Sequence, residues 1–419
     1  MTGAGGVLDR MIRVGLNERR GCDRRRAQIN VRPMSPSPRR NRLAAMRTSA
    51  PRVLIVGGGI AGLTLAAALR CNGIEPTVVE RVARYGDVGY VITLWPMGRL
   101  VVEHLGLGRR FDALTVPINT YSTHVDGGAR LRDFDFRGHL GDGVPRALRR
   151  AELIELLGSY AGGTEVQMAR TVTSIEQDGH VVLARFDDGA SAEFDVVVGA
   201  DGIDSGLRGL VAGDVPMRRT GLRLWTWWTR GIGVAPDESH EFWGTARYFG
   251  YNPTTGPVGC AAALRATDAP ATPAQLRDRL YGVAGQRDWM LDALDDLDRV
   301  GCFDLADLRM RDWRFGRVVL LGDAGAAFLP TAGVGASMAM ESALVLAEEL
   351  SKVEAAQVPD ALRRYVLRRR ARVDAVQNRS RWLIPVMLRR TRFGTAVRNA
   401  MVRALPENAV ISEITRWNP

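Results

Sequence analysis

The fold of this chain is decided by the stretch Arg52-Val-Leu-Ile-Val-Gly-Gly-Gly-Ile-Ala-Gly-Leu63 and, shortly after it, Thr77-Val-Val-Glu80. The apolar, β-branched run at 53–56 predicts a buried parallel strand. Three glycines follow at G-x-G-x-x-G spacing, Gly57, Gly59 and Gly62. A sequence rich in Ala and Leu comes directly after them and predicts a helix. A helix N-terminus offers free N–H groups and a positive dipole end, and glycines let an anion approach closely. The stretch therefore predicts a pyrophosphate site where a strand turns into a helix.

The second apolar run ends in a carboxylate, Glu80, which lies 18 residues beyond Gly62. A carboxylate at the tip of this strand can accept hydrogen bonds from both ribose hydroxyls of an adenosine. The same charge would repel a 2′-phosphate, so the resident nucleotide is expected to be FAD or NAD and not NADP. The alternative interpretation of the glycines alone is a surface turn, which the strand, the helix and the downstream acid together disfavour.

Composition indicates an enzyme-sized globular protein with a basic tail. The chain has 419 residues, 46% hydrophobic and 25% charged, with a formal net charge of +11. Residues 1–50 hold twelve Arg and three acids, so 12 − 3 = +9 of that charge lies there. We expect this segment to be a disordered Arg-rich tail, and residues 1–45 to be an upstream extension before Met46. A targeting arm or a nucleic-acid contact is the alternative.

The remaining composition argues against several classes of protein. Four cysteines show no C-x-x-C pairing, and five histidines show no metal-ligand spacing, so no metal site is expected. No run of 18 apolar residues and no signal-peptide hydrophobic region is present, which predicts a cytoplasmic protein without a membrane span. Charged helical sequence at 359–403 is typical of a solvated helix face.

Two later segments return to the sheet that the opening stretch begins. The strand at 195–200 is apolar on both faces and ends in Asp201, with Arg208 in the helix that follows. Another buried strand delivers Asp323, after which Pro330 sets a turn and glycines at 333 and 335 open a long helix. A carboxylate can hold ribityl hydroxyls, and the helix start suits something anionic. The alternative for this second pattern is a loop before a core helix.

A tryptophan-rich segment at 213–304 predicts a second sheet. Alternation places Leu224, Thr226 and Trp228 on one face and Trp225 and Trp227 on the other. We expect one face to form a pocket wall for a flat apolar ligand, although filling of the core is the simpler explanation for each tryptophan. The predicted domains are a tail at 1–50, a discontinuous dinucleotide domain at 51–117, 137–212 and 305–352, a substrate domain at 118–136 and 213–304, and C-terminal helices at 353–419.

Taken together, these three motifs make the chain resemble the single-component FAD-dependent aromatic hydroxylases. The resemblance is to the group typified by p-hydroxybenzoate hydroxylase, especially its urate and salicylate hydroxylase-like branch, and covers about Val53 to Trp382. It implies an α/β fold: a Rossmann-like FAD-binding domain with a βαβ core and a β-meander, interleaved with a smaller mixed-sheet substrate domain and followed by C-terminal helices.

The resemblance also implies roles for individual residues. FAD would be bound non-covalently by Gly57, Gly59, Ile60, Ala61, Gly62, Glu80, Arg81, Arg150, Asp201, Arg208, Asp323, Gly333, Gly335 and Ala336. Asp201 and Arg208 would also serve transient docking of NADPH or NADH. The substrate pocket would include Thr226, Trp228, Tyr248 and Pro330.

The implied activity is an NAD(P)H- and O2-consuming monooxygenase that hydroxylates an aromatic or polyketide-like molecule through a flavin C4a-hydroperoxide. The chain departs from the family pattern where Ala326 replaces a frequent His, Ser337 a frequent Asn, and Thr226 the urate-type Arg. These changes argue against urate, and no catalytic acid or base is identified. Alternatives are a flavin oxidoreductase without oxygen insertion and a catalytically idle FAD-binding protein. The oligomeric state is not predicted.

Overall fold

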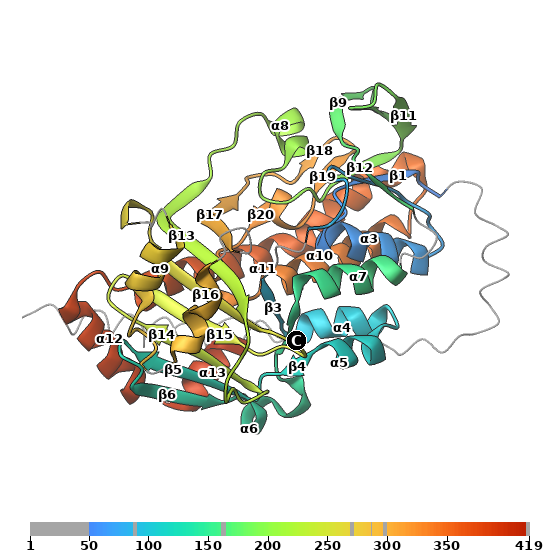
Figure 1. Ribbon diagram of the computed structural model, residues 1–419. Helices are drawn as coiled ribbons and strands as arrows, with labels where there is room; N and C mark the ends of the chain where they lie inside the picture. The colour runs from blue at the N-terminus through green and yellow to red at the C-terminus, as the bar shows by residue number, and fades with distance from the viewer. Residues whose placement is uncertain are drawn as a thin grey trace, which may run out of the picture. The chain divides into compact units, whose positions relative to one another are not determined.

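The computed structural model describes residues 50–86, 90–160, 165–268, 272–285, 287–295 and 300–415. The predicted Arg-rich tail, except for residue 50, lies outside these residues. Two large sheets and two small ones account for the strands of the described part (Figure 1).

The central sheet has six strands in the order β18-β19-β12-β1-β2-β8. Its middle strand, β1 (Val53–Val56), is buried along its whole length and runs parallel to both neighbours, with Leu54 paired to Val197 on one side and to Thr77 on the other. The other strands are β2 (Thr77–Glu80), β8 (Val166–Met168), β12 (Val196–Gly199), β19 (Val318–Leu320) and the antiparallel edge strand β18 (Arg314–Phe315). Residues 53–56 are therefore all apolar because both faces of the strand are buried, as predicted.

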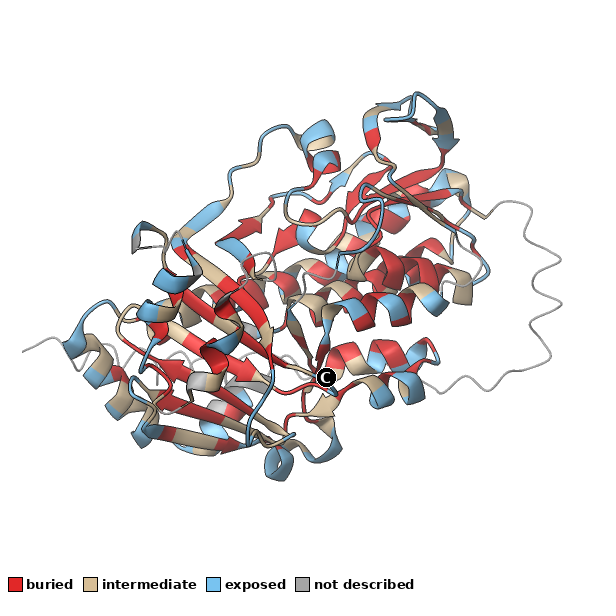
Figure 2. Cartoon of the chain, viewed as in Figure 1, coloured by how far each residue is buried: buried red, intermediate tan, exposed pale blue. Residues whose placement is uncertain are grey.

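Different layers cover the two faces of this sheet. Val53 and Ile55 pack in a core with three helices: α3 (Ile60–Cys71), α7 (Arg150–Tyr160) and α10 (Gly335–Leu350). In Figure 1 these helices lie side by side under β1 and β12. Leu54 and Val56 point the other way and pack against the β-meander. Figure 2 shows that α3 and α10 are buried along most of their length.

The β-meander that the resemblance implies consists of β9 (Val172–Gln177), β10 (Val182–Phe186) and β11 (Ser191–Phe194), joined by turns at Asp178-Gly179 and Asp188-Gly189. Residues 166–168 do not belong to it, because they pair with β2 as strand β8. The strand that follows the meander enters the central sheet as β12, as predicted.

The second large sheet has eight strands in the order β20-β17-β13-β16-β15-β14-β5-β6. Segments 118–136 and 213–304, far apart in sequence, both contribute strands to it, and β17 runs on to residue 309. The strands are β5 (Thr120–Val125), β6 (Arg130–Asp135), β13 (Arg218–Thr229), β14 (Glu238–Trp243), β15 (Tyr248–Asn252), β16 (Val258–Arg265), β17 (Gly301–Arg309) and β20 (Ala326–Ala327).

The two faces of this sheet carry different side chains, as the alternation predicts. Trp225 and Trp227 pack with Phe242 and Phe249 in a core closed by α9 (Pro273–Leu280) and a 3-10 helix, η4 (Asp288–Asp295). Strand pairing puts Thr226 and Trp228 on the opposite face, in register with residues 261 and 259. We call this opposite face the Thr226 face.

Smaller elements connect and cover the two large sheets. A three-stranded sheet consists of β3 (Val91–Leu94), β7 (Arg146–Arg149) and β4 (Val116–Pro117). The helices around it are α4 (Pro96–His104), α5 (Gly108–Leu114) and α6 (Phe136–Leu140), whereas α8 (Gly206–Ala212), which follows β12, packs against β9 of the meander. The chain ends in α11 (Val358–Met387), α12 (Arg392–Ala404) and α13 (Glu407–Thr415). None of the helices in the described ranges carries an apolar stretch sufficient to cross a bilayer.

Candidate functional site

The turn between β1 and α3 is so tight that only glycine fits at two of its positions. Gly57 has a φ of +110°, and a Cβ there would lie 2.4 Å from the carbonyl oxygen of Ala200. A Cβ on Gly62 would lie 1.9 Å from the carbonyl oxygen of Gly57. Gly59 differs, because a Cβ there would meet nothing within 4 Å. Packing therefore explains Gly57 and Gly62 but leaves Gly59 beside open space, as the close approach of a ligand requires.

Two helices begin near this turn without an acidic residue or a side-chain cap. Gly59 is the N-cap of α3, whose first turn holds Ile60 and Ala61. The first turn of α10 holds Gly335 and Ala336 and likewise lacks a cap from a side chain. Such helix starts favour a negatively charged partner. The chemistry of both ends fits the pyrophosphate and the flavin end of FAD.

Glu80 fixes the glycine turn to the end of β2. Its Oε2 accepts the N–H of Gly58 at 2.8 Å, and its Oε1 accepts the N–H of Val82 at 3.1 Å. The Tyr85 hydroxyl donates to the carbonyl of Gly58 at 2.8 Å. Burial, followed by the charge of Glu80, raises the pKa of Tyr85 to about 12. Arg81 is exposed beside this group.

Arg150 connects this end of the site to Asp323. It is the first residue of α7, and its N–H donates to the carbonyl of Tyr90 at 3.1 Å. Its charge acts on Tyr85 and also on Asp323, which lies in a short 3-10 turn, η6 (Gly322–Ala324), after β19. Solvent reaches the Asp323 side chain. Desolvation by the surrounding protein nevertheless raises the pKa of Asp323 to about 6, and the positive charge of Arg150 opposes this shift. The charges of Glu80 and Arg150 both act on Tyr85, and the charge of Arg150 also acts on Asp323, so Glu80, Arg150 and Asp323 lie along one path.

Asp201 and Arg208 are already engaged within the protein. Asp201 accepts the hydroxyl of Ser205 at 2.6 Å at the start of α8. The Arg208 side chain is buried, and its guanidinium donates to the carbonyls of Ile203 at 2.7 Å and Ala324 at 3.1 Å. Arg208 therefore anchors the turn that carries Asp323, and docking of a nicotinamide nucleotide there stays a prediction.

The loop before α10 brings the central sheet close to β3. Pro330 is exposed at the start of a 3-10 turn, η7 (Pro330–Ala332), and Gly333 ends that turn with a φ of +60°. A Cβ on Gly333 would lie 3.4 Å from Nε1 of Trp95, and the backbone N–H of Trp95 donates to the Ser337 hydroxyl at 3.1 Å. Ser337 thus holds the residue that precedes α4.

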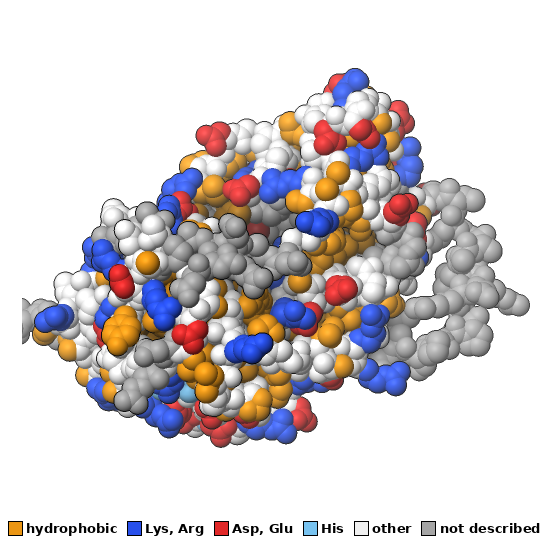
Figure 3. Space-filling model, in the orientation of Figure 1, with side chains coloured by type: hydrophobic (Ala, Val, Ile, Leu, Met, Phe, Trp, Pro, Cys, Tyr) orange, Lys and Arg blue, Asp and Glu red, His pale blue; other side chains and the backbone are white. Residues whose placement is uncertain are grey.

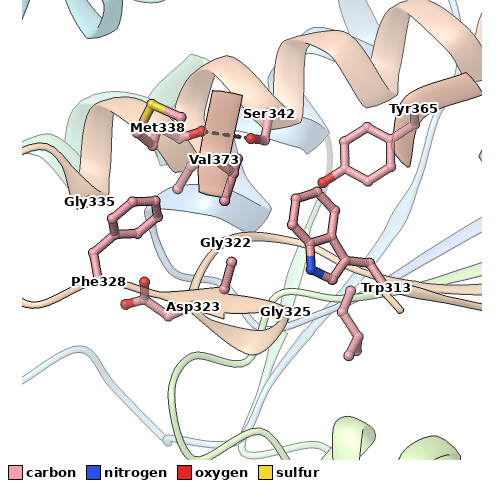
Figure 4. Close-up of a pocket in the computed structure, with 13 residues that line it drawn as sticks. Trp313, Gly322, Asp323, Gly325, Phe328, Gly335, Met338, Ser342, Tyr365 and Val373 are labelled. Carbon is pink, nitrogen blue, oxygen red and sulfur yellow. Dashed lines mark hydrogen bonds between the residues drawn. The ribbon is translucent and has the colours of Figure 1, made fainter. Parts of the chain in front are cut away.

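A small cavity lies behind the Asp323 turn, between α10 and α11 (Figure 4). Trp313, Ser342 and Tyr365 line its inner part, and Asp323 and Gly335 line it on the other side. Its volume of about 20 Å³ suits about one water molecule and not an isoalloxazine ring. The cavity is therefore a neighbour of the candidate cofactor site and not the site itself.

The predicted substrate residues lie on the Thr226 face or beside it. Thr226 is 5% exposed, and its hydroxyl has no hydrogen-bond partner in the described part of the chain. Trp228 and Tyr248 are half-buried on the same face. Leu329, next to Pro330, packs in one apolar cluster with Tyr248. The face thus adjoins the loop that precedes α10.

A carboxylate that the sequence analysis did not identify lies on this face. Glu241, on β14, accepts hydrogen bonds from the hydroxyl of Tyr121, from Nε1 of Trp243 at 2.7 Å and from the hydroxyl of Tyr248 at 3.1 Å. Burial raises the pKa of Glu241, and the three hydrogen bonds oppose the shift. The Thr226 face therefore has an ionisable group, although the sequence suggested none.

The sequence indicates which residues share a face with Glu241, but not which face of the sheet this is. Alternation in Glu-Ser-His-Glu-Phe-Trp at 238–243 puts Glu241 on one face with Trp243. Which face that is depends on pairing with β5 and β15, from residues 120–125 and 248–252, and no local pattern encodes this pairing.

Comparison with known proteins agrees with this geometry. Residues 51–380 match the family described as FAD binding domain. An FAD-dependent urate hydroxylase of Klebsiella pneumoniae is 30% identical over 376 residues, covering 83% of this chain and 96% of the relative. The 3-amino-4-hydroxybenzoate 2-monooxygenase PtmB3 of Streptomyces platensis is 32% identical over 361 residues, covering 79% and 87%.

A solved structure extends the similarity to the fold. The crystal structure of Klebsiella pneumoniae HpxO complexed with FAD and uric acid superposes with a TM-score of 0.81 at 26% identity, covering 88% of this chain and 96% of that one. The chain therefore belongs to the FAD binding domain family and is one of its FAD-dependent aromatic hydroxylases.

Proposed function

We propose that this protein is a monooxygenase that holds FAD non-covalently, takes electrons from NADH or NADPH, and uses O2 to hydroxylate an aromatic or polyketide-like molecule. The observation that carries the proposal is the path from Gly59 through Glu80 and Arg150 to Asp323, which ends beside the Thr226 face. Membership of an FAD-dependent hydroxylase family supports the cofactor.

The residues of the path suit successive parts of FAD. The α3 N-terminus at Gly59 would take the pyrophosphate, because it has free N–H groups and no Cβ in the way. Glu80 keeps lone pairs for ribose hydroxyls beyond the two N–H groups that it accepts. Asp323 would accept ribityl hydroxyls, and the α10 N-terminus would stabilise negative charge on the flavin. Bound flavin supplies the redox chemistry and the activation of O2.

The protein would orient the substrate and exclude water. The Thr226 face presents a buried unpaired hydroxyl, half-buried aromatic rings and one carboxylate, which together suit a flat ring with polar substituents. The loop at 328–334 and the end of α11 pack on the same apolar cluster, so the face is sheltered from bulk solvent.

Three other functions compete with this proposal. A flavin oxidoreductase without oxygen insertion and a catalytically idle FAD-binding protein would use the same cofactor path. A nucleic-acid binder would need a basic surface, whereas the face shown in Figure 3 has Lys and Arg interspersed with Asp and Glu. Oligomeric state is not part of the proposal.

Anaerobic reduction followed by oxygen exposure tests the proposal. We expect the purified protein to retain FAD, to be reduced by NADH or NADPH, and to consume O2 faster when an aromatic substrate is present. An 18O-labelled product separates oxygen insertion from simple oxidation. Failure to bind added FAD would exclude every flavin function, and reduction without labelled product would favour the oxidoreductase.

A further inference from the structure

One row of side chains crosses the Thr226 face from strand to strand. Strand pairing aligns Thr226 on β13 with Ala261 on β16, Gly250 on β15 and Glu241 on β14. Adjacent strands lie about 4.8 Å apart, so the two ends of the row are about 14 Å apart. The second position holds only the methyl group of Ala261, and the Tyr248 phenol lies over Gly250 at the third position. The row is therefore low at Ala261 and has polar groups on both sides of that position.

At one end, Glu241 fixes the direction of the hydrogen bonds around it. The hydroxyls of Tyr121 and Tyr248 both donate to Glu241, and a tyrosine hydroxyl has one proton. The remaining lone pairs of both hydroxyl oxygens can therefore only accept. The Tyr248 oxygen lies over the middle of the row, since a Cβ on Gly250 would be 2.7 Å from it. A molecule in the row thus meets acceptors at this end.

No cation in the described part of the chain pairs with the Glu241 carboxyl group. The hydrogen-bond partners of Glu241 in the described chain are two tyrosines and Trp243, and its pKa is shifted by burial and by these hydrogen bonds alone. Three donors occupy three of about four lone-pair positions of the carboxylate. One acceptor position remains for a donor that is not part of this cluster.

At the other end, Thr226 offers a hydroxyl that can donate or accept. Its oxygen is buried and has no partner among the described residues. Its partner on β17 is Gly301, where a Cβ would lie 2.7 Å from the Thr226 hydroxyl and 3.1 Å from the ring of Phe303. Phe303 is partly exposed and makes an edge-to-face contact with Tyr90 at 6.0 Å between centroids. Tyr90 in turn feels the charges of Arg150 and Asp323, so this end of the row is the one beside the candidate flavin path.

We propose that Glu241, acting through Tyr121 and Tyr248, selects neutral aromatic molecules that carry a phenol or an aromatic amine, and discriminates against aromatic carboxylates. This inference takes one point from the proposed function, namely that the substrate binds along the row. A hydroxyl or amino group can fill the open acceptor position, whereas a carboxylate would place a second negative charge against acceptors. Glu241 is thus a specificity-determining residue.

The test compares two bicyclic probes of the same size, 2-naphthol and 2-naphthoate, by isothermal titration calorimetry on the oxidised full-length protein. We expect 2-naphthol to bind at least about tenfold more tightly than 2-naphthoate. Glu241→Gln, which removes the charge at constant size, is expected to reduce that ratio at least about fivefold, chiefly by improving 2-naphthoate. Tyr248→Phe is expected to weaken 2-naphthol.

Ser239→Ala is the matched control. Ser239 lies on the same strand and face as Glu241 and donates to Asn252 at 2.8 Å, so its loss should leave the ratio unchanged. The proposal is overturned if wild-type protein binds neither probe, if it binds 2-naphthoate as well as 2-naphthol, or if Glu241→Gln changes both affinities by one factor. If Glu241→Gln does not fold, an unchanged ratio in Tyr248→Phe overturns the proposal. Calorimetry measures binding without turnover. A protein that binds no FAD or consumes no O2 would therefore contradict the proposed function, whereas the calorimetric results test the role of Glu241.

Discussion

At the scale of single residues, the glycine turn distinguishes packing from ligand binding. Gly62→Ala puts a Cβ 1.9 Å from a carbonyl oxygen, so we expect the free energy of unfolding to fall by at least about 2 kcal/mol. Gly59→Ala has space and an ordinary φ of −77°, so its stability should match the wild type while its affinity for FAD falls at least about tenfold. Urea unfolding and quenching of FAD fluorescence measure the two effects. A Gly59→Ala protein with wild-type FAD affinity would contradict the pyrophosphate position.

A second prediction for single residues concerns Asp323 and the dependence of FAD affinity on pH. Ribityl hydroxyls donate to the ionised carboxylate, and the pKa of this group is raised to about 6. Above pH 7 the affinity of apo-protein for FAD should be constant, and below pH 6 it should weaken by up to about tenfold per pH unit as Asp323 is protonated. Asp323→Asn should bind weakly at every pH. An equal pH dependence in the variant and the wild type would show that another group titrates.

At the scale of elements, a histidine pair joins β5 to β14. His124 Nε2 and His240 Nδ1 lie 2.9 Å apart, both rings are buried, and burial, first among several causes, lowers the pKa of each to about 4. Above about pH 7.5 both are neutral in the folded and the unfolded chain. As pH falls from 6.5 toward 4, the unfolded chain binds protons that the folded pair excludes, so the free energy of unfolding falls.

This linkage has a measurable size. Between pH 7.5 and pH 5 we expect a loss of about 2 kcal/mol per histidine, as an upper value for a coupled pair. His240→Phe keeps an aromatic ring against Tyr251. In urea unfolding, this variant should lose only about half as much free energy of unfolding between pH 7.5 and pH 5 as the wild type. His180→Gln, at an exposed turn of the meander, serves as the control and should leave the loss intact. Identical losses in all three proteins would mean that other groups cause the acid sensitivity.

Elements are also where the sequence was most informative. The apolar run of β1, the alternation of Trp225 and Trp227 and the glycines of the first turn each follow from local rules, and the structure contains them as predicted. The site could be predicted only where one element supplies it. Glu241 was missed because its three donors come from three strands, and Arg208 is committed to carbonyls that only the folded chain brings near it.

At the scale of the whole molecule, one buried carboxylate ties the second sheet to the C-terminal helices. Asp307 on β17 is 1% exposed and pairs with Arg218 on β13 and with Arg381 on α11. Asp307→Ala would leave the partly buried Arg381 without its partner, while solvent screens the charge of Arg218, so we expect the free energy of unfolding to fall by about 2 kcal/mol. Urea unfolding measures the loss.

A nearby exposed ion pair provides the comparison. Asp304, three residues earlier on β17, pairs with Arg223 at 2.8 Å in an exposed position. Asp304→Ala should cost less than about 1 kcal/mol, because solvent screens the pair. Equal losses from the two variants would contradict the role given to Asp307.

The strand order of the central sheet also has a consequence for synthesis on the ribosome. β1 lies beside β12, which begins at residue 196, and β12 lies beside β19, which begins at residue 318. Leu63 and Leu65 of α3 pack in one core with Met338 and Met340 of α10. A nascent chain of three hundred residues has therefore made the glycine turn but still lacks the strand and the helix that complete its surroundings. Until residue 350 emerges, the apolar side of α3 has no partner from α10, and chaperones that hold apolar helices have a target throughout that interval.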